Sequence, residues 1–469
     1  RRGARVSSRI AVIGGGPAGY EAALVAAELG AAVTVVTDEG LGGNCVLWDC
    51  VPSKALIVAA EAMGWLATAG RLGIDVSGGD GAARVDYPRV AAEVLELGVS
   101  QSADIERRLR DGGVEIVQGR GRVTRERRVD VACADGSDRQ VDADHVLIAT
   151  GSTPRVLDFA PPDGERILTG QQIYGLDHLP EHLVVVGSGA TGAEFAHAFC
   201  RFGSRVTLVS SRDLILPTED PDAAQVIEDV FERRGMTIVR RARAVSCARD
   251  GDRVVVGLDD GRSIEASHAL FTVGQIPATQ NLGLEDVGVE LGPSGGIQVD
   301  RVSRTSVPWI YAAGDVTGRM MLASVAAMQG RTAMWHALGQ ALEPIRWDSV
   351  AATVFTDPEV STVGRDPQAA ADAGMPVATA RLDFRRNPRA KMIHGTDGFV
   401  KVHAMVGSGT VVGAVVVSAR SSDLIQPLAV AVQNRLTVEQ LARTITVYPS
   451  MAGSIAECAR MLMSRLDEA

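Results

Sequence analysis

The sequence predicts an α/β protein in which two βαβ units are followed by a C-terminal α+β domain. Two glycine-rich turns carry this prediction, because each lies between a short apolar strand and an apolar helix. The turns occupy residues 14–19 and 187–192. After about residue 346 the pattern changes to alternating strands and helices without another such turn. There we expect strands at 399–402 and 411–417 and helices at 423–434 and 438–443.

The composition is that of a globular protein with several domains. A chain of 469 residues is long enough for three or four domains, and its 46% hydrophobic and 22% charged residues suit buried cores. The net charge of -10 disfavours nucleic acids and anionic membrane surfaces, because polyanions would be repelled. We therefore expect small-molecule partners or a second copy of the chain, and no nucleic acid.

The first residues offer a twin-arginine pattern, but glycines, Pro17 and Glu21 interrupt the apolar run that export requires. No stretch of about 18 or more uninterrupted apolar residues follows, so we expect a cytoplasmic protein without a membrane span. The six cysteines are too scattered for a disulfide scaffold. Only Cys45 and Cys50 are close neighbours.

The first βαβ unit has the features of a Rossmann-like dinucleotide-binding domain. A strand at 10–13, a helix that ends near Leu29 and a strand at 33–36 surround the turn. The three turn glycines permit the turn itself, the approach of a pyrophosphate, and close packing of helix on strand. These are Gly14, Gly16 and Gly19. The alternative is a tight turn without a ligand, which the surrounding strand and helix disfavour.

The acidic residue that binds the ribose in such domains is shifted here. Thr37 ends the second strand, and Asp38 and Glu39 follow it, so either carboxylate could bind the ribose hydroxyls.

The second unit repeats the pattern with a strand at 182–186, a helix at 194–202 and a second strand at 206–209. Its turn glycines are Gly187, Gly189 and Gly192. Two dinucleotides are therefore expected in one chain.

Residues 41–54 contain the string G-G-x-C-x4-C-x-P-S-K. It resembles the active-site segment of class I pyridine nucleotide-disulfide oxidoreductases of the lipoamide dehydrogenase and glutathione reductase type. The resemblance implies that Cys50 contacts the flavin and that Cys45 exchanges with substrate. The alternative is a pair of buried cysteines that never bond, since free cysteines often serve as small apolar residues.

The resemblance extends over the whole chain and implies bound FAD, NADPH and/or NADH, and a homodimer. It places Asp315 on the ribityl chain of the flavin and pairs Glu194 with Lys54 beside flavin N5. The other cofactor-binding residues that it implies are Gly43, Asn44, Gly121, Ala149, Thr150, Gly151, Gly274, Leu322 and Ala323. The implied domains are an FAD-binding domain at 1–157 and 274–345, an NAD(P)-binding domain at 158–273 and a dimerisation domain at 346–469.

The nicotinamide-binding unit lacks the glutamate that NAD-preferring members carry at the end of the second strand. The chain has Ser210, Ser211 and Arg212 there. Arg212 could pair with the 2′-phosphate of NADPH or could be a solvated loop residue, and both interpretations remain open.

The family's C-terminal His-Pro-x-x-x-Glu motif is altered, because Tyr448 replaces the histidine and Gly453 the glutamate. A tyrosine has an ordinary pKa near 10, against about 6.5 for histidine, and is poorly matched to proton transfer at neutral pH. Asp49 would further disfavour a neighbouring thiolate. None of the eight histidines offers an obvious substitute base. Reduction of a quinone by the flavin needs no such base.

The sequence therefore favours an oxidoreductase that passes electrons from NAD(P)H through FAD to a quinone or a similar small acceptor, with no metal. The chain is also similar to an atypical actinobacterial branch of lipoamide dehydrogenase homologues that is associated with this activity. The Y-P-x-M-A string resembles the soluble transhydrogenase branch, which makes NADPH-to-NAD transfer one alternative. True disulfide reduction with another base and a regulatory flavoprotein are the others.

Overall fold

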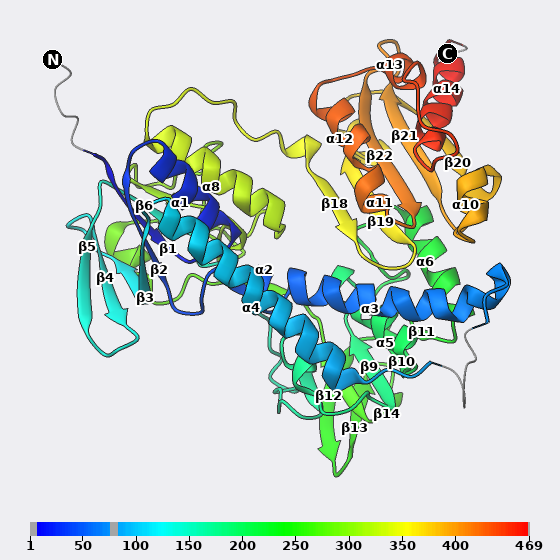
Figure 1. Cartoon of the computed structure of the whole chain (residues 1–469), viewed down its shortest axis with the longest axis horizontal. Helices are drawn as coiled ribbons and strands as arrows, with labels where there is room; N and C mark the ends of the chain where they lie inside the picture. The colour runs from blue at the N-terminus through cyan, green and yellow to red at the C-terminus, as the bar shows by residue number, and fades with distance from the viewer. Residues whose placement is uncertain (1–6, 76–82, 468–469) are drawn as a thin grey trace. The chain divides into compact units, whose positions relative to one another are not determined.

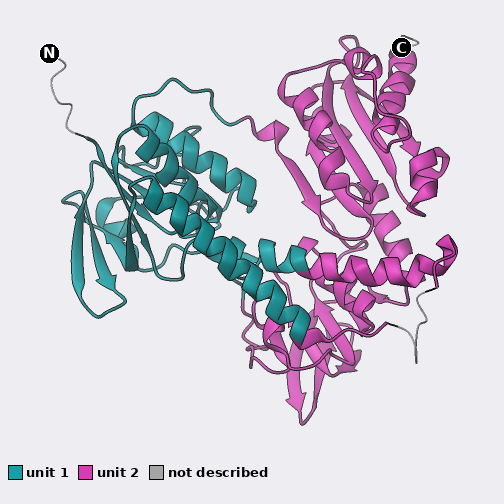
Figure 2. Ribbon diagram, in the orientation of Figure 1, with its two compact units in different colours: residues 1–55, 89–155, 274–345 teal, residues 56–88, 156–273, 346–469 magenta. Residues whose placement is uncertain are grey.

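The computed structural model describes residues 7–75 and 83–467. The chain forms two compact units, each assembled from segments that are separated in the sequence (Figure 2). Unit 1 contains residues 1–55, 89–155 and 274–345, and unit 2 contains residues 56–88, 156–273 and 346–469. The FAD-binding segment predicted at 1–157 thus has residues 56–88 in the other unit. The division into functional domains stays a prediction.

Unit 1 is built on a seven-stranded sheet with the order β17-β6-β1-β2-β3-β4-β5. Its central strand β1 has four buried apolar residues in succession, as expected for a parallel strand covered on both faces. The strands are β1 (Arg9–Ile13), β2 (Ala32–Thr37), β3 (Glu115–Val123), β4 (Arg128–Cys133), β5 (Asp138–Asp142), β6 (His145–Ile148) and β17 (Ile310–Ala312). Strands β17, β6, β1, β2 and β3 are parallel, whereas β3, β4 and β5 form an antiparallel meander.

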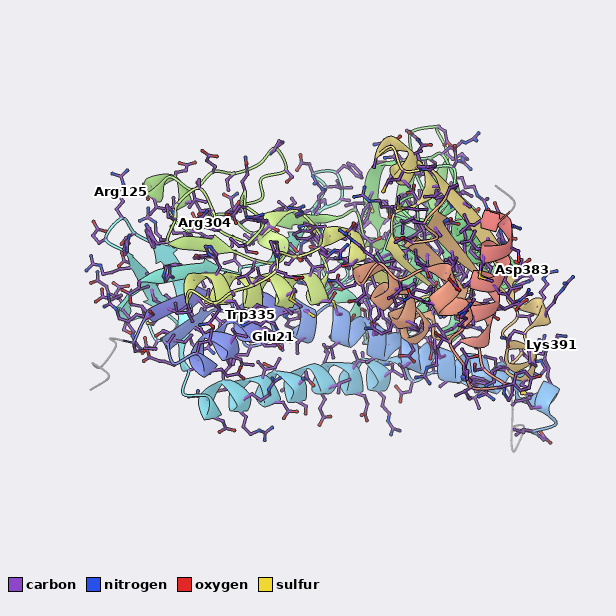
Figure 3. The ribbon with its side chains drawn as sticks, turned by 90° about the horizontal axis from the view of Figure 1, so that it is seen from above. Glu21, Arg125, Arg304, Trp335, Asp383 and Lys391 are labelled. Atoms are coloured by element: carbon purple, nitrogen blue, oxygen red, sulfur yellow. The ribbon has the colours of Figure 1, made fainter. Side chains whose placement is uncertain are left out.

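Helices α1 (Pro17–Glu28) and α8 (Ala323–Ala337) pack against each other in unit 1. Gly330 makes this approach possible, because a Cβ atom there would lie 2.2 Å from the carbonyl oxygen of Ala18. Arg331 on α8 donates two hydrogen bonds to the Glu21 carboxylate on α1. Figure 3 labels Glu21 and Trp335 on these two helices. Segments about 300 residues apart are joined in this way.

The redox motif lies on α2 (Gly43–Leu47) and the start of α3 (Cys50–Thr68), and η1 (Ala69–Leu72) follows. By length and composition the stretch Gly43–Leu72 is apolar enough to cross a membrane, with a hydropathy of 1.3 and 33% of the window buried. The expectation of no such stretch considered only uninterrupted apolar runs. This stretch carries Lys54 and Glu61, and a single helix of this kind is weak evidence, because core helices pass the same test.

The first part of unit 2 contains a parallel five-stranded sheet of order β11-β10-β9-β15-β8. An antiparallel meander of β12, β13 and β14 packs with it. The sheet strands are β8 (Ile167–Thr169), β9 (His182–Val186), β10 (Arg205–Val209), β11 (Thr237–Val239) and β15 (His268–Phe271). The meander strands are β12 (Ala244–Asp250), β13 (Arg253–Leu258) and β14 (Ser263–Ala266), and the helices are α5 (Ala190–Phe202) and α6 (Pro221–Arg233). Strand β9 is buried throughout, like β1.

The C-terminal part of unit 2 is an antiparallel five-stranded sheet of order β18-β19-β22-β21-β20, covered by helices (Figure 1). The strands are β18 (Ala351–Val354), β19 (Glu359–Gly364), β20 (Val377–Asp383), β21 (Phe399–Met405) and β22 (Val411–Ser418). The helices are α11 (Ser421–Leu424), α12 (Gln426–Gln433), α13 (Val438–Ala442) and α14 (Gly453–Asp467). The single helix expected at 423–434 is divided in two, because Pro427 begins a new helix in the first turn of α12.

Two ionic contacts join the two parts of unit 2. Asp220 caps α6 and accepts hydrogen bonds from the Lys401 ammonium on β21, and both side chains are about 90% buried. The Asp357 carboxylate, after β18, forms ion pairs with Arg201 on α5 and with Arg234 at the end of α6, each at 2.6 Å. Removing one member of either ion pair would leave a poorly solvated charge, so these contacts hold the two parts of unit 2 together.

We expect Gly330→Ala to lower the free energy of unfolding by about 1–3 kcal/mol, because its Cβ would overlap the Ala18 carbonyl and force α1 and α8 apart. Thermal unfolding followed by circular dichroism measures the change. Gly175→Ala is the matched control, since nothing lies within 4 Å of a Cβ at that position. An unchanged midpoint for Gly330→Ala would contradict the packing described for this pair of helices.

Candidate active site

The first glycine turn connects β1 to α1 at the carboxyl edge of the unit 1 sheet. Gly14 has a φ of 109°, and a Cβ there would lie 2.2 Å from the carbonyl oxygen of Ala149. A Cβ on Gly19 would lie 1.9 Å from the carbonyl oxygen of Gly14. Side chains are therefore excluded at both positions, and the first turn of α1 is pressed against the turn that precedes it.

The second turn repeats this geometry in unit 2. Gly187 has a φ of 111°, and a Cβ there would lie 2.4 Å from the carbonyl oxygen of Thr272. A Cβ on Gly192 would lie 1.8 Å from the carbonyl oxygen of Gly187. The two turns are thus equivalent in conformation and in the backbone contacts that demand glycine.

The middle glycine of each turn faces open space. Nothing lies within 4 Å of a Cβ built on Gly16 or Gly189, and these two residues are the N-caps of α1 and α5 without any side-chain cap. Exposed backbone N–H groups and the helix dipole favour an anion there. Both turns therefore fit the pyrophosphate of a dinucleotide, FAD in unit 1 and NAD(P)H in unit 2.

The segment after β6 lies beside the first turn. Ala149 donates its N–H to the carbonyl oxygen of Ile13 at 2.7 Å, and the Thr150 hydroxyl donates to the carbonyl of Ala278. The Gly151 carbonyl accepts a hydrogen bond from the Ala278 N–H. Strands β7 (Ser152–Pro154) and β16 (Gln275–Pro277) continue this pairing. The chain therefore leaves unit 1 after residue 155 and returns at residue 274 through two paired strands.

Asp315 and the start of the redox segment meet on Ser152. The Ser152 hydroxyl donates to Asp315 Oδ2 at 2.8 Å, and the Asn44 side-chain amide donates to the Ser152 carbonyl at 2.8 Å. Burial raises the pKa of Asp315, the Ser152 hydrogen bond opposes the rise, and the charge of Asp49 adds to it. Three segments that are distant in the sequence thus meet at Ser152.

The two cysteines lie in consecutive helices, Cys45 within α2 and Cys50 as the first residue of α3. Both thiols are half-buried, and neither is part of a disulfide. Helix α4 (Tyr87–Asp111) supports this segment, because the Ser102 hydroxyl donates to the Leu41 carbonyl and a Cβ on Gly98 would lie 2.8 Å from the Val46 carbonyl. Helix α4 therefore fixes the backbone of the cysteine segment at Leu41 and Val46.

Electrostatics at the loop disfavour a thiolate on Cys45. A hydrogen bond with Cys50, burial, and the charges of Cys50 and Asp49 raise its pKa, and only Lys54 lowers it. Burial also raises the pKa of Asp49, again opposed by Lys54. The Asp49 carboxyl group therefore acts on the Cys45 thiol in the direction that the sequence predicts.

Of the two candidate ribose ligands after β2, Asp38 pairs with Arg120 on β3 at 3.1 Å. Burial, followed by the charge of Asp38, raises the pKa of Glu39.

The structure also places the remaining predicted residues of unit 1. Gly43 begins α2, Gly121 lies in β3 against Ile13, Gly274 precedes β16, and Leu322 and Ala323 cap and begin α8.

Lys54 belongs to α3 in unit 1 and Glu194 to α5 in unit 2, so their pairing stays a prediction. Glu194 is 4% exposed, and its carboxylate accepts the Phe355 N–H at 2.9 Å. The sequence reasoning missed Phe355, because its contribution is a backbone group and has no residue-type signal.

The expected base position lies on an exposed segment between α13 and α14. Tyr448 is 84% exposed, with Ile445 at 98% and Val447 at 79%. Gly453 begins α14 and donates its N–H to the Ser450 hydroxyl. Among the described histidines, His197 and His403 are buried, and burial lowers their pKa values to about 3 and about 4. Both are therefore packing residues rather than proton acceptors at neutral pH.

Ser210 follows β10 and is fully buried. Its hydroxyl accepts hydrogen bonds from the Ser188 hydroxyl at 2.8 Å and from the Arg212 N–H at 3.1 Å. The Ser210 hydroxyl therefore joins the phosphate turn to the end of the second strand, and its hydrogen bonds are made within the protein. Arg212 is exposed.

Tyr20 on α1 and Ser152 are site residues that the motifs did not reveal. Burial, Glu21 and the charge of Cys45 raise the pKa of Tyr20, so its hydroxyl lies within electrostatic reach of the thiol. Ser152 directly follows the predicted residues Ala149, Thr150 and Gly151, but only the fold shows that it binds Asp315.

The paired nucleotide turns, the dithiol segment and the C-terminal sheet define a flavoprotein disulfide reductase architecture. Residues 8–330 match the model of the pyridine nucleotide-disulphide oxidoreductase family, and residues 350–459 match its dimerisation domain. The chain belongs to this family, as the sequence predicted.

Among its relatives is the NAD(P)H dehydrogenase (quinone) of Mycobacterium tuberculosis, which is 51% identical over 98% of this chain and 95% of the relative. The dihydrolipoyl dehydrogenase of Chlorobaculum tepidum is 33% identical over 96% of each chain. The crystal structure of LpdA from M. tuberculosis matches with a TM-score of 0.92 and 49% identity, over 97% of this chain and 100% of that chain. The predicted similarity to the actinobacterial homologue is confirmed.

We expect substitutions at the two open glycines to separate the nucleotide sites. Gly16→Val should lower the FAD content of the purified protein, because its side chain would occupy the space of a pyrophosphate. Gly189→Val should leave FAD bound and weaken NADP⁺ binding by about tenfold or more, or about 1.4 kcal/mol. The 450 nm absorbance and calorimetric titration measure these effects. Loss of both ligands in both variants would contradict two independent sites.

We also expect Asp49→Asn to accelerate alkylation of Cys45 in the reduced protein. Removal of the neighbouring negative charge lowers the pKa of the thiol, so more thiolate is present at a given pH, and the rate should rise roughly threefold or more near pH 8. Iodoacetamide labelling followed by peptide mass spectrometry distinguishes Cys45 from Cys50. Asp38→Asn, which removes a carboxylate paired with Arg120, is the control, and an equal acceleration there would refute the electrostatic explanation.

Proposed function

We propose that the protein transfers electrons from NADPH or NADH through bound FAD to a quinone or a similar small acceptor. The observation that carries the proposal is the position of the altered dyad. Tyr448 and Gly453 stand where the family has its acid–base pair, whereas both dinucleotide turns are intact. The name of the M. tuberculosis relative, NAD(P)H dehydrogenase (quinone), supports the same reaction.

The chemistry of the thiols supports this choice. Disulfide exchange needs the interchange cysteine as a thiolate, and Cys50, burial and Asp49 all raise the pKa of Cys45. Loss of a positioned general base commonly reduces a rate by about 10²–10⁴. A quinone that approaches the flavin needs neither the thiolate nor the base.

The chain's own residues would hold the cofactor and exclude competing chemistry. The N-termini of α1 and α5 bind the two pyrophosphates, and Asp315, fixed by Ser152, binds the ribityl hydroxyls. Lys54, which the family pairs with Glu194, would place a positive charge near the reacting ring. Bound FAD supplies a centre that accepts a hydride and passes electrons on singly or in pairs.

The dimerisation domain supports a homodimer, and the exposed segment that carries Ile445, Val447 and Tyr448 would be covered in it. A partner subunit therefore belongs to the working enzyme, which is assayed as the assembled holoenzyme.

We expect NADPH- or NADH-dependent reduction of a benzoquinone to proceed in Cys45→Ser at close to the wild-type rate, while lipoamide and glutathione disulfide support little turnover. Stopped-flow absorbance at 450 nm measures reoxidation of the reduced enzyme by each acceptor. Fast reoxidation by NAD⁺ alone would favour transhydrogenation instead. Lipoamide turnover that disappears in Cys45→Ser would establish a disulfide reductase.

The double substitution Tyr448→His with Gly453→Glu tests the carrying observation directly. If the missing dyad limits disulfide exchange, restoring it should raise lipoamide turnover by about tenfold or more and change quinone reduction little. Tyr448→Phe is the matched control, because it restores no base. Loss of quinone reduction in Tyr448→Phe would contradict the proposed independence from this position.

A further inference from the structure

The two nucleotide turns are equivalent, but the strands that end beside them carry opposite charges. In unit 1, β2 is followed by Asp38 and Glu39. In unit 2, β10 is followed by two serines and Arg212. The end of this second strand faces the 2′ position of the adenosine ribose in a dinucleotide-binding fold. In unit 2 no carboxylate follows the strand directly, and the first one, Asp213, comes after Arg212.

A second arginine reaches the same edge from the neighbouring strand. Strand β11 pairs with β10, with Val239 opposite Val209. Beyond the strands the two loops stay joined, because Arg241 donates its N–H to the carbonyl of Arg212 at 3.1 Å and Ala242 donates to Ser210 at 3.0 Å. The backbone of Arg241 is thus fixed beside that of Arg212.

Arg240, which precedes Arg241, is committed elsewhere, because it binds Glu228 and Glu232 on α6 at 2.8 and 2.7 Å. The Arg212 guanidinium has no ion pair in the ranges 7–75 and 83–467. Arg241 pairs only with Asp213 in those ranges, and the two side chains are 78% and 75% exposed.

An ion pair this exposed contributes little to stability, so a phosphate dianion could replace the Asp213 carboxylate at small cost.

From these observations, and resting on the proposed use of NAD(P)H, we propose that Arg241 joins Arg212 to bind the 2′-phosphate of NADPH. Asp213 competes with that phosphate for Arg241 and so sets the preference between NADPH and NADH. Two guanidinium groups that approach from adjacent strands can donate several charge-assisted hydrogen bonds to one phosphate. The Asp213 carboxylate weakens NADPH binding and has little effect on NADH, which carries a neutral hydroxyl group at the 2′ position.

Calorimetric titration of the FAD-loaded enzyme with NADP⁺ and NAD⁺ tests the proposal without turnover. Arg241→Gln should weaken NADP⁺ binding by about ten- to a hundredfold and change NAD⁺ binding by less than about twofold. Asp213→Asn should tighten NADP⁺ binding and leave NAD⁺ unchanged. The wild-type Kd for NADP⁺ should also rise more steeply with salt than that for NAD⁺.

Arg253→Gln is the matched control, because Arg253 forms a similarly exposed pair with Glu265 on the meander of the same unit. Equal loss of NADP⁺ and NAD⁺ binding in Arg241→Gln, or no change in their ratio, would overturn the assignment. Wild-type enzyme that binds NAD⁺ but not NADP⁺ would overturn it as well. Failure of the wild type to bind either nucleotide would instead overturn the proposed function on which the assignment rests.

Discussion

The close approach of each first helix to the glycine turn before it sets the geometry of both nucleotide sites. Gly19 and Gly192 allow α1 and α5 to begin directly above the carboxyl ends of β1 and β9. This contact leaves the helix N-termini uncapped and turned toward open space, where a pyrophosphate neutralises them. The Ala149 segment in unit 1 and Thr272 in unit 2 close the turns from the neighbouring strands. Any side chain at these contacts would displace the helix that binds the phosphate.

In unit 1, the charges beside the first nucleotide turn disfavour a thiolate on Cys45 and therefore disfavour thiol exchange. Its carboxyl groups Asp49 and Asp315 are buried, which raises their pKa values, and Asp49 also raises the pKa of Cys45. The family's dithiol is therefore retained in surroundings that disfavour a thiolate on Cys45. The groups that would hold the flavin are independent of the thiols, because they are backbone groups and Asp315 fixed by Ser152. This separation supports the proposed transfer of electrons to another acceptor.

Local sequence patterns predicted the elements whose signals are short-range. The two strand–turn–helix units, the parallel sheets and the change to an α+β domain near residue 346 were all expected, and the comparisons confirm the fold class and the family. The predicted helix at 423–434 was wrong in its continuity, because Pro427 starts a second helix. The long helices α3 and α4 were not predicted. Helix α3 is apolar on most sides, and its sequence was interpreted only as a redox motif.

The sequence by itself determined the paired nucleotide turns, the Cys45 and Cys50 loop, and the Tyr448 and Gly453 residues on which the proposed function rests, because each is a matter of residue types at fixed spacing. Tertiary structure alone decided which groups meet: Ser152 with Asp315, Phe355 with Glu194, and Arg241 with Arg212 and Asp213. These contacts join segments from different strands through backbone groups or exposed side chains. No periodicity or motif marks such partners, because their proximity arises only when the parallel strands are ordered in the sheet.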